Sequence, residues 1–204
     1  MSESEMTELE AMEAAIEQQK AMLELAGAFH EHGLMLPMRT IYLGGNEVDA
    51  KMAGRFVRNM AFLEGLGGEP ITIIMNNPGG DVYHGLAMYD AIDRCKCDTR
   101  VIVRGHAMSM GSIILQAAKV RIMGPNATQM IHYGTDTFTG HAKVFEKRGD
   151  ESKRLNEWME GMYLGRMQEK QEGAKLEDLR EMLRYETFLT AKQSVELGLA
   201  DGIG

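Results

Sequence analysis

The chain has 204 residues, of which 44% are hydrophobic and 25% are charged, values typical of one globular domain with a substantial core. Its formal net charge of -8 argues against a nucleic-acid or anionic-membrane partner, because such surfaces need clustered Lys and Arg. No apolar run approaches the ~20 residues of a membrane span, and the acidic N-terminus lacks the basic and apolar parts of a signal peptide. We therefore expect a cytoplasmic protein with no membrane contact.

The two cysteines, Cys95 and Cys97, flank a single lysine. Without further Cys or His residues at ligand spacing nearby, they do not match a zinc site. We interpret them as reduced thiols in a cytoplasmic-type compartment, and we expect neither a metal nor a cofactor.

The N-terminal segment, residues 3–30, contains no proline and no glycine before Gly27. Apolar residues recur at helical spacing among Glu, Gln and Ala, which predicts an amphipathic helix or a pair of helices. The apolar stripe must be covered, either by the same domain or by a partner subunit. We predict a helical extension over residues 1–36 and a second, compact domain over residues 37–204.

Strands and helices alternate through that domain, which implies βαβ units and a mainly parallel sheet. The apolar run 71–75 predicts a strand that is buried on both faces. A charged helix over residues 142–172 is longer than a small domain needs for its own packing, so we expect it to project. The other predicted strands are 40–43, 99–103, 120–123 and 128–132, and the other predicted helices are 49–64, 83–95, 113–118, 176–183 and 192–197.

Ser109 lies between the apolar strand 101–103 and the apolar helix that follows it. Backbone N–H groups at the start of a helix lack intrahelical partners and can face a developing negative charge. Ser109 is therefore a candidate nucleophile, provided that a histidine reaches it. The Gly-x-Ser-x-Gly elbow is half met, because Gly111 fits and Gly105 stands too far upstream. The alternative is that Ser109 is a helix N-cap, a position that serine favours.

Several further motifs occur in one order along the chain, and together they resemble the Clp protease proteolytic subunit, ClpP. The resemblance extends from about residue 38 to residue 204. It implies an α/β fold of the ClpP/crotonase type, a superhelix of βαβ units with a projecting handle helix. The matching motifs are Thr40-Ile41-Tyr42-Leu43-Gly44-Gly45, Asn77-Pro78-Gly79-Gly80, Ala107-Met108-Ser109-Met110-Gly111, Met130-Ile131-His132 and Phe188-Leu189-Thr190-Ala191.

The resemblance also implies roles for individual residues. Ser109 falls on the family's nucleophile and His132 on its general base, and a neutral imidazole can take the serine proton and return it to the leaving amine. The backbone amides of Gly80 and Met110 match the family's oxyanion hole, where glycine permits the close approach of the substrate.

The third position of the triad departs from the family, which has aspartate where this chain has Glu186. A glutamate can also accept the imidazole N–H, as in Ser-His-Glu triads of other folds, so we predict that Glu186 completes the triad. The alternative is a surface carboxylate, with Asp136 or a carbonyl orienting His132.

A ClpP-like chain is expected to be a serine endopeptidase that cleaves unfolded polypeptides or peptides inside stacked heptameric rings, with the handle mediating contact between rings. The N-terminal 36 residues do not resemble the axial loops through which ClpP meets an AAA+ unfoldase, so this partner gains no support from the sequence. Two other interpretations stay open. One is a non-catalytic ClpP-like scaffold subunit, and the other is a crotonase-type acyl-CoA enzyme.

Overall fold

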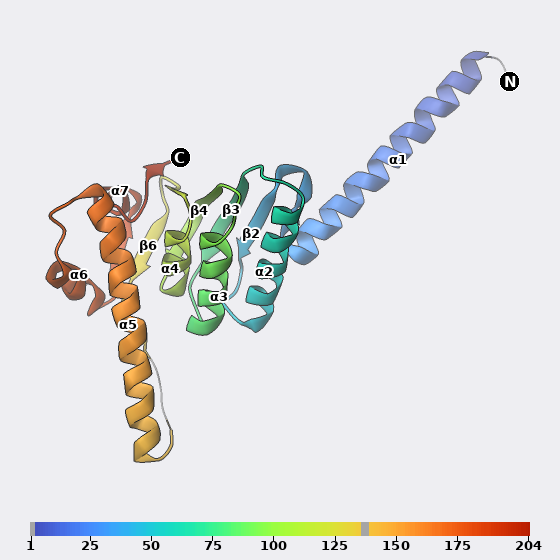
Figure 1. The fold of residues 1–204 in the computed structure, drawn as a ribbon. Helices are drawn as coiled ribbons and strands as arrows, with labels where there is room; N and C mark the ends of the chain where they lie inside the picture. The colour runs from blue at the N-terminus through green and yellow to red at the C-terminus, as the bar shows by residue number, and fades with distance from the viewer. Residues whose placement is uncertain (1–2, 136–138) are drawn as a thin grey trace.

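A computed structural model describes residues 3–135 and 139–204, which form a central sheet with helices on it and two long helices that extend away from it (Figure 1). The strands are β1 (Leu34–Met35), β2 (Thr40–Gly44), β3 (Ile71–Asn77), β4 (Thr99–Met108), β5 (Val120–Met123), β6 (Thr128–Ile131), β7 (Thr187–Thr190) and β8 (Gly202–Ile203). The helices are α1 (Glu3–His32), the 3-10 helix η1 (Leu36–Met38), α2 (Ala50–Gly65), α3 (Val82–Asp93), α4 (Met110–Gln116), α5 (Ala142–Lys170), α6 (Leu176–Leu183) and α7 (Ala191–Glu196).

The sheet is mostly parallel, as the alternation of strands and helices predicts. Its order is β1-β2-β3-β4-β5-β8, and β1 alone on this path pairs antiparallel to its neighbour. The first half of β4 pairs with β5, whereas its end pairs with β6, which continues antiparallel to β7. Gly105 lies between the two halves with a φ of +102°, and an added Cβ there would lie 2.5 Å from Asn76 Oδ1. Glycine therefore permits the bend that turns the end of β4 toward β6.

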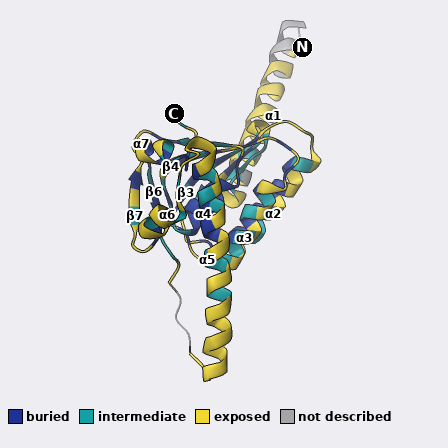
Figure 2. Ribbon diagram, turned by 60° about the vertical axis from the view of Figure 1, so that its left-hand side comes forward, coloured by how far each residue is buried: buried dark blue, intermediate teal, exposed yellow. Residues whose placement is uncertain are grey.

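The core lies mainly between the sheet and helices α2, α3 and α4, where Figure 2 shows the buried residues gathering. Along β3, Ile71, Ile73 and Met75 are fully buried, whereas the alternate residues Thr72 and Ile74 are half-buried. The prediction that this strand is buried on both faces is therefore wrong for the single chain. The apolar side chains on its second face are covered only in part.

Helix α5 projects from the body for about half its length, as predicted (Figure 1). Residues 141–150 are all exposed, whereas Met159, Tyr163 and Met167 further along the helix are buried against the core. The helix is thus anchored by its C-terminal half. Within the described ranges, no helix has both the length and the apolar character that crossing a membrane requires.

Helix α1 is a single continuous helix that leads away from the sheet (Figure 1). Met12, Ile16 and Leu23 on it are 62%, 43% and 67% exposed. The prediction that the same domain covers this apolar stripe is therefore wrong. The body holds only the end of the helix, where Arg55 and Asn59 of α2 donate to its last carbonyls, those of Glu31 at 3.1 Å and His32 at 2.9 Å. The domain boundary at residue 36 stays a prediction.

Candidate active site

Ser109 lies on a sharp turn between β4 and α4. Its backbone has φ 50° and ψ -122°, and Arg39 is the one other non-glycine residue of the described ranges with a positive φ. Such a backbone costs an L-residue on the order of 1–3 kcal/mol and is typical of functional sites. Ser109 occupies the N-cap position of α4, but its side chain makes no capping bond. A capping role for the hydroxyl is therefore wrong.

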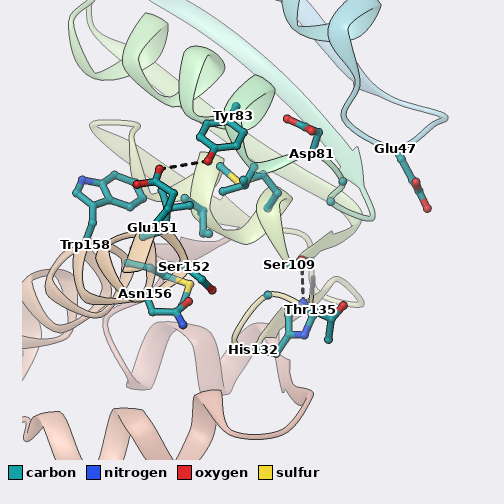
Figure 3. Close-up of a pocket in the computed structure, with 18 of the residues that line it drawn as sticks. Glu47, Asp81, Tyr83, Ser109, His132, Thr135, Glu151, Ser152, Asn156 and Trp158 are labelled. Carbon is teal, nitrogen blue, oxygen red and sulfur yellow. Dashed lines mark hydrogen bonds between the residues drawn. The ribbon is translucent and has the colours of Figure 1, made fainter. Parts of the chain in front are cut away.

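His132 follows β6 directly, and its Nε2 lies 2.8 Å from Ser109 Oγ (Figure 3). The sheet brings the two side chains together. Because β4 and β6 are parallel and pair Met108 with Met130, the residues after their carboxyl ends meet at the same edge. The N–H of Ser109 also donates to Met130 O across 2.9 Å, which fixes the turn against β6. Both members of the pair are half-buried.

The loop Pro78-Gly79-Gly80 lies directly against this turn. A Cβ added at Gly79 would stand 2.7 Å from Ser109 Cβ and 2.9 Å from Met110 N, and one added at Gly80 would stand 2.5 Å from Val48 N. No larger residue fits in either place without movement of the backbone. Among the backbone bonds of the described residues, the N–H groups of Gly80 and Met110 have no acceptor. Gly80 follows Gly79 and Met110 follows Ser109, the two residues in this contact, so their N–H groups are candidate donors for an oxyanion hole.

A cavity of about 760 Å³ opens next to the Ser109–His132 pair, within the size range of substrate sites. One wall is apolar, and Glu47 and Asp81 lie at its margin (Figure 3). Helices α3, α4 and α5 all contribute to the lining, so the cavity lies between the core helices and the handle. The apolar wall consists of Val82, Met110, Ile113, Met130, Leu155, Trp158 and Met159.

Two contacts join α3 to α5 along this cavity. The hydroxyl of Tyr83 donates to Glu151 Oε1 across 3.2 Å (Figure 3), and the rings of Tyr89 and Trp158 pack edge to face with centroids 5.2 Å apart. The Arg154 guanidinium, which binds both oxygens of Glu151, holds the pKa of that carboxyl below its usual range. Glu151 is therefore an anion at neutral pH, and we assign it no proton-transfer role.

Glu186 lies between α6 and β7, with its side chain exposed. The antiparallel ladder pairs Ile131 with Thr187, so one step further along places Glu186 across from His132. Among the described residues, however, the carboxylate makes no hydrogen bond to the imidazole. Its role in the triad stays a prediction. The alternative residue, Asp136, lies outside the residues that the structure describes.

A buried polar layer that includes Ser112, Gln129 and Tyr163 is not among the sequence predictions. Tyr163 Oη lies 2.9 Å from Ser112 Oγ, and Gln129 Nε2 lies 2.8 Å from the same oxygen. Burial raises the pKa of Tyr163 far above its usual value, so the phenol stays protonated. Gln129 Oε1 is the one buried side-chain oxygen or nitrogen of the described residues without a partner. The sequence contains no clear signal for this layer, because β6 (Thr128–Ile131) contains two polar residues and nothing marks Gln129 as buried.

A comparison with protein families matches most of the chain. The Clp protease family model matches residues 27–204, which include every residue of the site. The match also covers the sheet, the handle helix and the last turn of α1. The chain therefore belongs to the Clp protease family.

Proposed function

We propose that the protein is a serine endopeptidase that cleaves unfolded polypeptides or peptides, with Ser109 as nucleophile and His132 as general base. The observation that carries this proposal is the 2.8 Å separation between Ser109 Oγ and His132 Nε2. Membership of a peptidase family supports it. So does the adjacent cavity, which is large enough for the side chains of a peptide.

The chemistry follows from the positions of these groups. As Ser109 Oγ attacks the peptide carbonyl carbon, His132 Nε2 takes its proton. The carbonyl oxygen becomes an oxyanion that accepts from the N–H groups of Gly80 and Met110. Collapse breaks the C–N bond, and the imidazolium gives its proton to the leaving amine. Water then attacks the acyl-serine through the same base, and a carboxylic acid and free Ser109 result.

We include Glu186 in the proposed triad because a carboxylate that accepts the imidazole N–H stabilises the imidazolium formed in both steps. The proposal requires the exposed Glu186 carboxylate to reach the imidazole nitrogen that does not face Ser109. We also propose that copies of the chain form stacked rings around a chamber, with α5 reaching between rings. The support is the long exposed stretch of that helix (Figure 2). The exposed stretch of α5 would be covered in such an assembly.

Labelling with a fluorophosphonate tests the proposal. Ser109 Oγ forms a P–O bond with the reagent as the P–F bond breaks, and fluoride leaves while the hydroxyl proton passes to His132. We expect labelling of Ser109 that is lost in Ser109→Ala and in His132→Ala, with peptide cleavage falling by roughly 10⁴-fold or more.

The two other interpretations give different outcomes. A scaffold subunit, and equally a crotonase-type enzyme that does not need this pair, would remain unlabelled at Ser109. Full peptidase activity in Ser109→Ala would refute the assignment of the nucleophile.

A further inference from the structure

A second cluster of polar side chains begins at the residue after His132, and its members are not among the residues that line the cavity. Glu160 of α5 is 7% exposed, and Arg180 of α6 binds both of its carboxylate oxygens, with Nε at 3.0 Å and Nη2 at 2.8 Å. The phenol of Tyr133 donates to Oε1 of the same carboxylate. We call Tyr133, Glu160 and Arg180 the clamp.

The clamp is continuous with the catalytic base through the backbone. Tyr133 is the residue after His132. Its phenol, held by Glu160, therefore fixes the side chain next to His132 in the chain. The N–H of Tyr133 donates to Leu183 O across 2.7 Å, which fixes the backbone as well. Leu183 is the last residue of α6, and the chain then runs directly to Glu186 and β7.

Three segments thus meet at one carboxylate: the end of β6 with His132, the base of the handle α5, and the helix that leads to Glu186. A bidentate carboxylate–guanidinium pair fixes orientation as well as distance. The charge state of the clamp is stable at neutral pH. The Arg180 guanidinium holds the pKa of Glu160 below its usual range, and burial together with the Glu160 carboxylate raises the pKa of Tyr133 to about 12.

We propose that Glu160 is a positioning residue for the reaction. Through Tyr133 and Arg180 it holds His132 within reach of Ser109 and keeps the segment of Glu186 against the end of β6. The inference rests on the proposed function, because it concerns the same catalytic base. It also links the handle to the site, since a displacement of α5 at Glu160 is passed directly to Tyr133.

The test uses the full-length protein and the fluorophosphonate, with the maximal inactivation rate separated from the reagent's binding constant. The variants are Tyr133→Phe, Glu160→Gln and Glu160→Ala. Misplacement of a reacting group by about 1 Å can cost on the order of 100-fold. We therefore expect Tyr133→Phe and Glu160→Ala to lower the maximal rate about 10- to 100-fold, with the binding constant changed less than about twofold. Glu160→Gln keeps an acceptor for the phenol and should retain more of the rate than Glu160→Ala.

Two controls separate positioning from general loss of stability. Glu169→Gln removes a carboxylate from an exposed ion pair with Arg166 on the same helix and should leave the rate unchanged. Ile92→Val removes one methylene from a buried residue of α3, far from the clamp in the sequence. It should lower the midpoint of urea unfolding and keep the maximal inactivation rate.

Different results overturn the two proposals. If the wild-type protein is labelled at Ser109 and Tyr133→Phe and Glu160→Ala keep its maximal rate, the clamp has no positioning role and the proposed function stands. If Glu160→Ala does not fold, Tyr133→Phe decides the question, because it removes a single hydroxyl. If the wild type is not labelled at Ser109, the proposed function fails, and the positioning role fails with it.

Discussion

Gln129 Nε2 lies 2.8 Å from Ser112 Oγ, and both side chains are fully buried. Ser112 lies one helical turn after Ser109, and Gln129 lies just before His132 on β6. The bond therefore joins the helix that follows Ser109 to the strand that leads to His132. Tyr163 of the handle contacts the same hydroxyl, so α5 is connected to the site here as well.

We expect Ser112→Ala to destabilise the protein more than Gln129→Met. Removing the Ser112 hydroxyl leaves both the Gln129 amide and the Tyr163 phenol buried without a partner, which costs about 1–3 kcal/mol per group. Gln129→Met removes one member of the bond together with an oxygen that already has no partner, and Tyr163 keeps its contact. Urea unfolding of both variants measures the difference. If Gln129→Met instead loses more free energy of unfolding than Ser112→Ala, the Gln129 side chain stabilises the protein through more than its bond to Ser112.

The strained backbone of Ser109 leads to a comparison of two variants that lack the Ser109 hydroxyl. Ser109→Ala keeps the Cβ that disfavours a φ of 50°, whereas Ser109→Gly adopts this conformation without strain. Relief of strain of on the order of 1–3 kcal/mol exceeds the extra entropy of glycine in the unfolded chain, which is about 0.5–1 kcal/mol. We therefore expect Ser109→Gly to have the higher free energy of unfolding, measured by urea denaturation. The opposite order would mean that the surrounding structure, and not the Ser109 backbone, bears the strain.

Much of the fold could be predicted from the sequence, because periodicity and ordered motifs are local signals. The strand 71–75 and the helix 142–172 correspond to β3 and α5, and the Clp protease match confirms the resemblance. The exposure of α1 could not be predicted, because a stripe such as Met12 and Ile16 shows that a cover is needed without showing what provides it. The same holds for β3, whose apolar run shows that both faces need a cover, whereas the single chain covers one of them only in part.

The site divides in a similar way. Ser109 and His132 belong to recognisable motifs, so both could be proposed from the sequence, and the structure places their side chains 2.8 Å apart. Glu160 could not be found in this way, because a glutamate in a charged helix looks like any surface residue. Its burial depends on Arg180, which comes from a different helix. Pairings of this kind arise from tertiary packing and leave no periodic signal in the chain.

Gly80→Ala should reduce peptide cleavage more than it reduces stability. An added Cβ would lie 2.5 Å from Val48 N and 2.6 Å from Val48 O, so the loop must move and carry the Gly80 amide with it. Loss of one oxyanion donor typically costs about 100- to 1,000-fold in turnover. Gly68→Ala is the matched control, because no atom lies within 4 Å of its added Cβ. Steady-state cleavage of a fluorogenic peptide measures both variants. Equal rates for the two would place the oxyanion donors elsewhere.

Removal of residues 1–26 should leave the compact part of the chain folded and reactive. The Clp protease match begins at residue 27, and the exposed stripe of Met12, Ile16 and Leu23 lies entirely in the deleted part. The bonds from Arg55 and Asn59 to the last turn of α1 are retained. We expect the free energy of unfolding to change by less than about 0.5 kcal/mol, as for surface changes. Loss of cooperative unfolding or of labelling at Ser109 would show that α1 belongs to the folded unit.

The clamp should make the stability of the protein depend on acid. The pKa of Glu160 is lowered in the folded chain, chiefly by its bonds to Arg180. A carboxyl of this kind contributes stability that is fully present above its unfolded pKa of about 4.3 and is lost as the pH falls through the lower, folded value. The advantage of the wild type over Glu160→Gln should therefore be constant from about pH 7 to 5 and shrink below about pH 4.

Urea unfolding of both proteins at several pH values measures this difference. Since Glu169 is exposed and paired only within α5, the Glu169→Gln control should show a much smaller trend. An advantage that persists unchanged at pH 3 would mean that Glu160 stabilises the clamp by shape and not by charge.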